Sequence, residues 1–255
     1  MTNSNFITIL HRHGLIGASV KFNDLPTDVQ RKLQQCTPLH CTDQYINLIA
    51  NVGATFWRLL QSSEFKDDPH PVDAFSHALA QQLIDTSDTA EQCAVLYPSS
   101  EPVPLMQLGK LLGWSSPSPL GLGLHPNYGP WFAYRAVIVS PRPLQTMTSI
   151  EASNPNTQQS VSAGSVCINC SAPCVTACPA SAVSLSNAFN IESCATYRLQ
   201  TDSDCADTCH ARYACPIGRE HQYSDAQTAH HMGRALVSLA SWFRASAPQS
   251  DRTKI

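Results

Sequence analysis

The order of apolar and polar positions predicts short strands alternating with helices through residues 1–140. Five apolar, β-prone runs are predicted as strands: residues 15–22, 45–52, 94–97, 120–125 and 131–140. Proline, asparagine and glycine at residues 126–130 predict a turn between the last two runs.

Helices are predicted between these runs, from residues 25–28 onward, at residues 55–60, from His70 onward, and at residues 105–112. The helix after His70 carries an apolar stripe at three- and four-residue steps: Val72, Phe75, Leu79 and Leu83. His77 lies off that stripe and is predicted at the surface. Strands mixed with helices in this way indicate an α+β fold.

A polar, proline-punctuated stretch at residues 141–164 predicts a domain boundary. We therefore expect a first domain at residues 1–145, a linker at 146–165 and a second domain at 166–255. The second domain is predicted to end in a helix at residues 226–244, whose stripe packs on the rest of the protein: Ala229, Met232, Leu236, Leu239 and Phe243. His230 and His231 are expected on its solvated face, with contact to a cofactor as the alternative.

The composition indicates which partners and which cellular location to expect. The 255 residues carry a net charge of −3 without blocks of lysine or arginine, which argues against nucleic acid as a partner. No stretch approaches the roughly 20 apolar residues of a membrane span, so no membrane insertion is expected. The start of the chain lacks a charged leader, and a cytoplasmic location is expected. In that setting, 11 cysteines indicate metal ligands more than disulfides.

Eight of these cysteines form two sets, each followed by a proline. The first is Cys167, Cys170, Cys174 and Cys178; the second is Cys194, Cys205, Cys209 and Cys215. The spacing resembles the bacterial ferredoxin run, in which three cysteines hold one [4Fe–4S] cluster and the fourth ligates its neighbour. This resemblance implies that Cys215 joins the first three as ligands of cluster I. Cluster II then takes Cys178, Cys194, Cys205 and Cys209.

The cysteine pattern departs from that run in two respects. One extra residue separates the second and third cysteines, and the second set has no CxxC. A single cluster with spare cysteines, a structural zinc or disulfides are the alternatives. Cys36 and Cys41 lack the spacing of a redox pair and are expected to be incidental, partly buried thiols.

A second resemblance lies in residues 119–140, PLGLGLHPNYGPWFAYRAVIVS. This stretch resembles the signature of the cobalamin-processing CblC (MMACHC-type) family, and Pro130 departs from that family's paired glycines. Residues of this chain at matching positions are Gly121, His125, Pro126, Tyr128, Trp131, Phe132, Ala133 and Arg135. Upstream, YINLIANVGATFWRLL and HPVDAFSHAL resemble the same family more loosely. The resemblance implies a nitroreductase-like sheet-and-helix domain that binds a corrinoid.

The cysteine segment, including the isolated IESC at Cys194, is similar to the ferredoxin part of epoxyqueuosine reductase and of cobalamin-dependent reductive dehalogenases. The two resemblances together imply a corrinoid-binding domain joined to a ferredoxin-like domain with two [4Fe–4S] clusters. The expected function is electron transfer from the clusters to cobalt, which reduces the corrinoid or removes its upper ligand. The electron donor would be a ferredoxin, a flavodoxin or a reductase.

A corrin ring is flat and mostly apolar, and it needs a wide apolar cleft with a few polar anchors. Gly121 and Gly123 would let the backbone approach the ring, Trp131 and Phe132 would supply flat surface, and Arg135 would supply donors. The glycines could instead be strand kinks, and the aromatic residues could be core. His125 could ligate cobalt or, as we expect, hydrogen-bond within its turn.

Two other hypotheses remain open at this stage. One is a non-catalytic corrinoid carrier or redox-sensing iron–sulfur protein. The other is a flavin-dependent reductase that holds FMN on the same fold. No catalytic acid can be assigned, because Asp67, Asp68, Asp73 and Tyr134 are candidates by position only.

Overall fold

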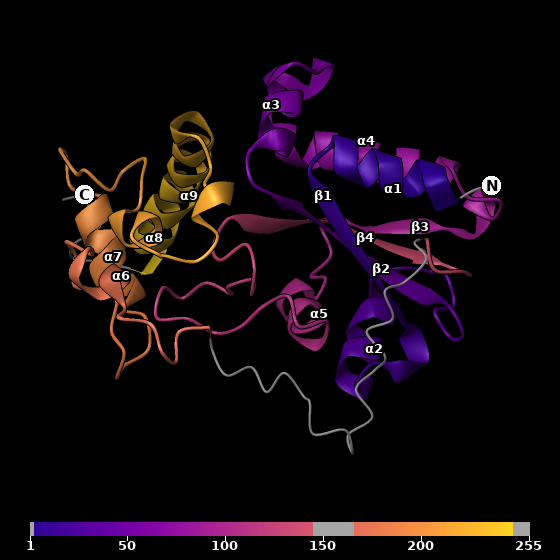
Figure 1. Ribbon diagram of the computed structural model, residues 1–255, viewed down its shortest axis with the longest axis horizontal. Helices are drawn as coiled ribbons and strands as arrows, with labels where there is room; N and C mark the ends of the chain where they lie inside the picture. The colour runs from indigo at the N-terminus through magenta and orange to yellow at the C-terminus, as the bar shows by residue number, and fades with distance from the viewer. Residues whose placement is uncertain (1–2, 145–165, 247–255) are drawn as a thin grey trace.

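A computed structural model describes residues 3–144 and 166–246. The predicted linker at residues 146–165 lies outside the described residues. Figure 1 shows a sheet covered by helices and, beside it, a helical, cysteine-rich segment. The fold is therefore mixed α and β, as the sequence pattern predicts.

The sheet has four strands in the order β1-β2-β4-β3, and every neighbouring pair is antiparallel. The strands are β1 (Leu15–Lys21), β2 (Tyr45–Val52), β3 (Ala94–Tyr97) and β4 (Phe132–Ser140). Four of the five predicted strands are thus confirmed, with shifts of one residue at some ends.

The strand predicted at residues 120–125 is wrong. This stretch is a loop that makes only isolated bridges, between Ser116 and Leu124 and between His125 and Gly129. Gly121 has φ +68°, and a Cβ there would lie 2.9 Å from the ring of Phe189 in the cysteine-rich segment. Leucine and glycine alternate here with the period of a strand, which explains the prediction. In the structure this stretch lies outside the sheet and contacts the second half of the chain.

Five helices surround the sheet: α1 (Asn3–Arg12), α2 (Thr27–Gln35), α3 (Thr55–Gln61), α4 (Pro71–Asp85) and α5 (Leu105–Leu111). All but α1 are predicted by the sequence. In α1, the four-residue step from Phe6 to Leu10 is the apolar signal, and both side chains are buried. Polar residues dilute this signal in the rest of the helix.

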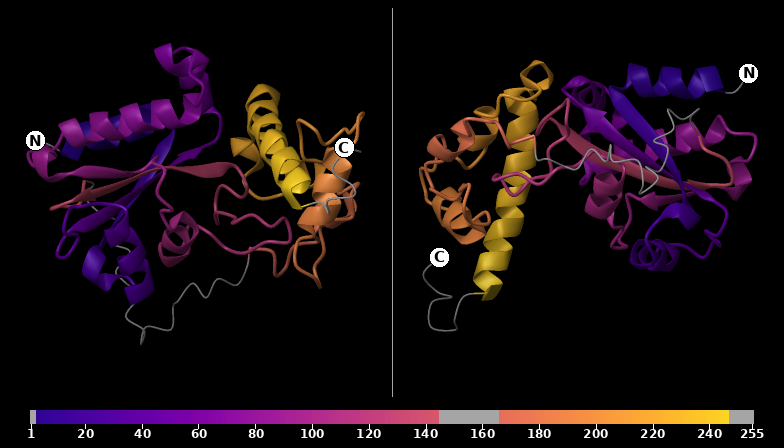
Figure 2. Two further views of the ribbon diagram at one scale, coloured as in Figure 1. Left: turned by 180° about the vertical axis from the view of Figure 1, so that it is seen from behind. Right: turned by 60° about the horizontal axis from the view of Figure 1, so that its bottom comes forward.

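Successive residues of the central strands face opposite sides of the sheet, because side chains alternate along a strand. Ile49 and Ile138 belong to the core beneath α1 and α4. Leu48 and Val137 belong to the core that includes residues of α2 and α5. Figure 2 shows these two helix pairs on opposite faces, so β2 and β4 are covered on both sides.

The cysteine-rich segment contains α6 (Pro173–Thr176), α7 (Ile191–Arg198), α8 (His210–Tyr213) and the long α9 (Asp225–Ser246). The predicted stripe of α9 is half-buried throughout. The expectation that His230 and His231 are solvated is wrong: both are half-buried, with their ring centroids 4.7 and 6.0 Å from that of Trp57 in α3. Among residues 3–144 and 166–246, no helix is long and apolar enough to cross a membrane.

Aromatic residues and the guanidinium of Arg212 are among the groups that join the two halves of the chain. Trp131 is fully buried, and its ring contacts Tyr213 and Tyr223 edge-on at centroid distances of 5.3 and 5.6 Å. The guanidinium of Arg212 lies 5.0 Å over Trp131 and 4.9 Å over Tyr223, and it donates to the carbonyl of Pro130. Such stacking retains the arginine charge while excluding water.

Two glycines let the backbones of the halves touch. Gly129 and Gly218 both have positive φ, 55° and 67°. A Cβ on Gly129 would lie 2.2 Å from the carbonyl oxygen of Ile217, and one on Gly218 would lie 2.5 Å from that of Tyr128. Only glycine fits either position without displacing backbone. The loop after Cys215 is therefore held directly against the turn that precedes β4.

We predict that Asn47→Ala lowers the free energy of unfolding by about 3 kcal/mol, because buried partners lose their hydrogen bonds. The Asn47 amide accepts from Ser19 Oγ at 2.6 Å and from Leu144 N at 3.1 Å, and it donates to Ser140 Oγ at 2.7 Å. Urea unfolding under anaerobic conditions measures this loss. Asn187→Ala, at an exposed position, is the control. A loss below about 1 kcal/mol for Asn47→Ala would contradict this reading of the network.

Candidate functional site

The eight cysteines gather in two groups of four, each lining its own cavity. The first cavity is lined by Cys167, Cys170, Cys174 and Cys215. Cys174 lies in α6 and Cys215 follows α8, so residues far apart in sequence converge here. The remaining lining is mainly apolar: Pro119, Leu120, Leu124, Ala172, Pro216 and Ile217, with Ser118.

The second cavity, of about 60 Å³, is lined by Cys178, Cys194, Cys205 and Cys209. Cys194 comes from α7, and Cys205 and Cys209 lie in the loop between α7 and α8. Leu120, Leu122, Val183 and Phe189 give this cavity an apolar side. The structure thus brings the cysteines together in the crossed grouping that the ferredoxin resemblance implies.

Backbone amides point at the sulfur atoms. Ala172 N donates to Cys170 Sγ at 3.3 Å, and Ala172 adopts φ +53°, which turns the chain just before Pro173 opens α6. Backbone hydrogen bonds also reach Cys215 from Ile217 and Cys205 from His210; burial raises the pKa of both thiols, and these hydrogen bonds offset part of that rise. Donors to sulfur stabilise thiolates and tune the potential of a bound iron–sulfur cluster.

Burial and mutual repulsion oppose ionisation of these thiols in the absence of a cation. Burial raises the pKa of Cys174, and the neighbouring Cys215, Cys167 and Cys170 raise it further. Burial raises the pKa of Cys205 to about 11, with Asp204 as the second cause. A positively charged metal centre would relieve both effects, because metal coordination deprotonates a thiol.

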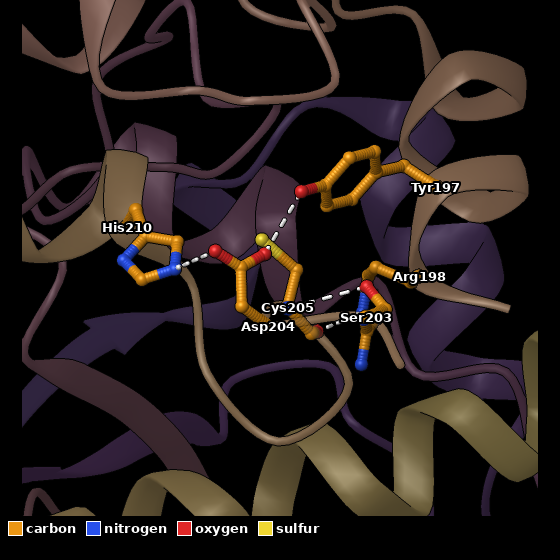
Figure 3. Close-up of polar contacts among 6 residues, drawn as sticks. All are labelled: Tyr197, Arg198, Ser203, Asp204, Cys205 and His210. Carbon is orange, nitrogen blue, oxygen red and sulfur yellow. Dashed lines mark hydrogen bonds and ion pairs between the residues drawn. The ribbon is translucent and has the colours of Figure 1, made fainter. Parts of the chain in front are cut away.

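Asp204 and His210 flank the second group (Figure 3). The Asp204 carboxylate accepts from Tyr197 Oη at 3.0 Å and pairs with His210 Nε2 at 3.2 Å. Together with Cys205, these residues hold three potential ligand atoms within 4.8 Å of one another. The buried Arg198 fixes the loop by donating to the carbonyls of Cys205 and Ala206, and it also reaches Met232 in α9.

A separate groove of about 400 Å³ opens on the surface between α5 and the loop around residues 115–123. Its lining residues are Met106, Gln107, Lys110, Ser115, Pro117, Ser118, Gly121, Leu122 and Gly123. Met106 and Leu122 remain 56% and 44% exposed, which is unusual for apolar side chains of this size. The groove therefore offers an apolar wall with a few polar groups, and its size is typical of a ligand site.

Two of the predicted corrinoid-binding residues, Gly121 and Gly123, line this groove. A Cβ at Gly123 would lie 1.9 Å from Ser115 Oγ and 3.0 Å from Met106 Cε, so these two side-chain ends would have to shift to make room for it. The groove residues of α5 were missed in the sequence reading. No sequence signal identified them, because the 56% exposure of Met106 on this short helix is evident only in the structure.

The other predicted corrinoid-binding residues lie away from the groove. Trp131 is in the contact between the two halves, and Phe132 belongs to the core beneath α2 and α5. Arg135 is buried in β4, where its Nε donates to Asn51 Oδ1 at 2.7 Å and its guanidinium lies 5.0 Å over the ring of Phe56. These contacts give all three residues structural roles.

His125 hydrogen-bonds within its turn. Its Nδ1 accepts from the backbone amides of Asn127 and Tyr128, at 3.1 and 3.4 Å, so the ring is neutral with its proton on Nε2. Burial lowers the pKa of His125 to about 4, and the charge of His221 contributes.

The remaining candidate residues line neither the two cysteine cavities nor the groove. Asp67, Asp68 and Asp73 are exposed, and burial raises the pKa of Tyr134. Cys36 and Cys93 are partly buried and Cys41 is fully buried, and each hydrogen-bonds to a nearby backbone carbonyl. None of the eleven cysteines forms a disulfide.

Comparison with known proteins gives a distant likeness among solved structures. No protein-family model matches the chain, and no curated protein matches it. Among solved structures, it is similar to a C. elegans B12-trafficking protein CblC, a homologue of human MMACHC, with 13% identity and a TM-score of 0.36. The match covers 55% of this chain and 70% of that protein. A likeness at this level assigns neither a ligand nor an activity.

The turn at His125 predicts a measurable dependence of stability on pH. Between about pH 6.5 and about pH 4, His125 is protonated in the unfolded chain but neutral in the folded protein. The free energy of unfolding therefore falls as the pH is lowered through this range. His125→Asn keeps an oxygen acceptor for the two amides but does not titrate. Between pH 7 and pH 5, the wild type should lose on the order of 1 kcal/mol more than the variant in urea unfolding. Equal losses would contradict the neutral, buried histidine.

Proposed function

We propose that this protein holds two [4Fe–4S] clusters and passes electrons from them to a corrinoid. The observation that carries the proposal is the gathering of eight cysteines into two crossed groups of four, each around its own cavity. Zinc in a structural site needs only four ligands, and a disulfide pairs only two. Four thiolates suit a zinc ion as well as a cubane cluster, and it is the ferredoxin-like spacing, with one ligand exchanged between the groups, that favours two [4Fe–4S] clusters.

The donor sets fit such clusters. No disulfide involves a cavity-lining cysteine, and backbone amides already face Cys170, Cys205 and Cys215. The apolar residues around each cavity limit access of water, which tunes cluster potential. When bound, each reduced cluster supplies one electron, and a corrinoid cobalt(III) that accepts it becomes cobalt(II) and releases its upper ligand with the bonding electron pair. A ferredoxin, a flavodoxin or a reductase would resupply the electrons.

The corrinoid part of the proposal rests on the signature at residues 119–140 and on the apolar groove beside it. In this reading, the chain positions the substrate and excludes water, whereas the redox chemistry belongs to the cofactors. Lys110, Gln107 and Ser115 supply polar groups at the groove that suit the amides rimming a corrin. Reduction of the corrinoid, or removal of its upper ligand, is the activity we expect.

Paired cysteine variants test the crossed grouping. Cys178→Ala and Cys194→Ala both remove ligands of the second group, so the double variant should keep one cluster, with about four irons per chain. If the groups followed sequence order instead, the same double variant would damage both clusters. Iron and sulfide analysis with EPR after anaerobic reconstitution separates these results.

Cys174→Ala with Cys194→Ala is the complementary variant, and it should lose both clusters because it removes one ligand from each group. Cys36→Ala with Cys93→Ala, which lie outside both groups, is the control and should retain about eight irons. Eight irons in the variant that lacks Cys178 and Cys194 would show that the assignment is wrong.

A further inference from the structure

We propose that the loop from Ser118 to Leu124 is a shared wall through which both cluster sites deliver electrons to one acceptor in the surface groove. This inference rests on the proposed function, because it places the substrate relative to the two cysteine groups. In this arrangement, the loop forms the contact between the electron source and the substrate.

The lining of the three cavities carries the inference. Ser118 lines both the groove and the cavity of Cys167, Cys170, Cys174 and Cys215. Leu122 lines both the groove and the cavity of Cys178, Cys194, Cys205 and Cys209. Leu120 lines both cysteine cavities. A single short segment therefore separates either cysteine group from the groove.

The wall is held tightly on its cysteine side. Leu120 and Leu124 are buried in one apolar cluster with Cys174 and Cys215. Gly121 lies against Phe189, which lines the cavity of the second group. Electron transfer slows steeply as the gap between donor and acceptor widens, so a thin wall packed on both groups suits the transfer of electrons.

The groove side suits a flat ligand with an apolar face. Met106 forms the opposite wall on α5 and is 56% exposed, and Gly121 and Gly123 present backbone without side chains. The volume of about 400 Å³ accommodates part of a corrin ring and leaves the rest of the molecule outside. In each transfer, substrate cobalt(III) gains one electron and becomes cobalt(II), and an external ferredoxin or flavin donor replaces the electron.

A charge placed on the groove wall tests the location of the substrate. Met106→Glu should weaken the binding of hydroxocobalamin to the reconstituted protein about tenfold or more, since the carboxylate would be buried against an apolar ring. Leu111→Glu is the matched control: it adds the same charge to the same helix, at a residue that is 45% exposed and outside the groove lining. Binding is followed by the visible spectrum, and iron content should not change in either variant.

Spin coupling tests the shared wall without relying on activity. Cys194→Ala should leave only the first cluster, and Cys170→Ala only the second. Hydroxocobalamin is added to each variant and reduced to cobalt(II) with dithionite. We expect faster relaxation and broadening of the cluster EPR signal in both variants. Broadening in only one variant, or in neither, would overturn the shared wall.

The outcomes separate this inference from the proposed function. If iron-loaded protein binds cobalamin but Met106→Glu and Leu111→Glu bind it equally well, the groove is not the site, and the proposed function stands. If protein with about eight irons binds no cobalamin, the proposed function is wrong, and this inference falls with it. FMN added to the same protein then tests whether a flavin occupies the groove.

Discussion

The cysteine-rich segment depends on bringing four thiol groups together around each of two cavities. A short segment such as residues 167–174 supplies three of them, and the fourth must come from elsewhere in the chain. Cys215, from the second set in the sequence, therefore completes the first group. Cys178, from the first set, completes the second group. This exchange interlocks the two halves of the cysteine segment. Buried thiols repel one another once ionised, so the interlocked arrangement gains most when a cation shares their charge.

The same interlocking fixes the cysteine segment to the sheet domain. The chain that follows Cys215 passes at once through Gly218, whose backbone touches the turn before β4. Arg212, which precedes Cys215, stacks between Trp131 and Tyr223. The loop before β4 is held from the other side by the contact between Gly121 and Phe189. The groove beside α5 thereby shares lining residues with the cavities of both cysteine groups.

The sequence predicted those helices and strands whose conformation is decided by the residues within them. The stripe of α4 and the apolar run of β2 have the periods of a helix and of a strand covered on both faces, and both elements formed where predicted. The loop at residues 120–125 was misread because contact with Phe189, not alternation, decides its conformation. His230 and His231 were misread for the same reason, since Trp57 lies far away in sequence. The grouping of the cysteines was inferred because their spacing resembles the ferredoxin run, whereas the groove formed by α5 and the loop that follows it has no such recognisable spacing.

The most direct test of this account is the iron and sulfide content of the anaerobically reconstituted wild-type protein, with EPR of its reduced form. Two crossed groups of four thiolates predict about eight irons and eight sulfides per chain, and two interacting cluster signals. About four irons, or zinc without sulfide, would contradict the central claim that both groups are iron–sulfur sites.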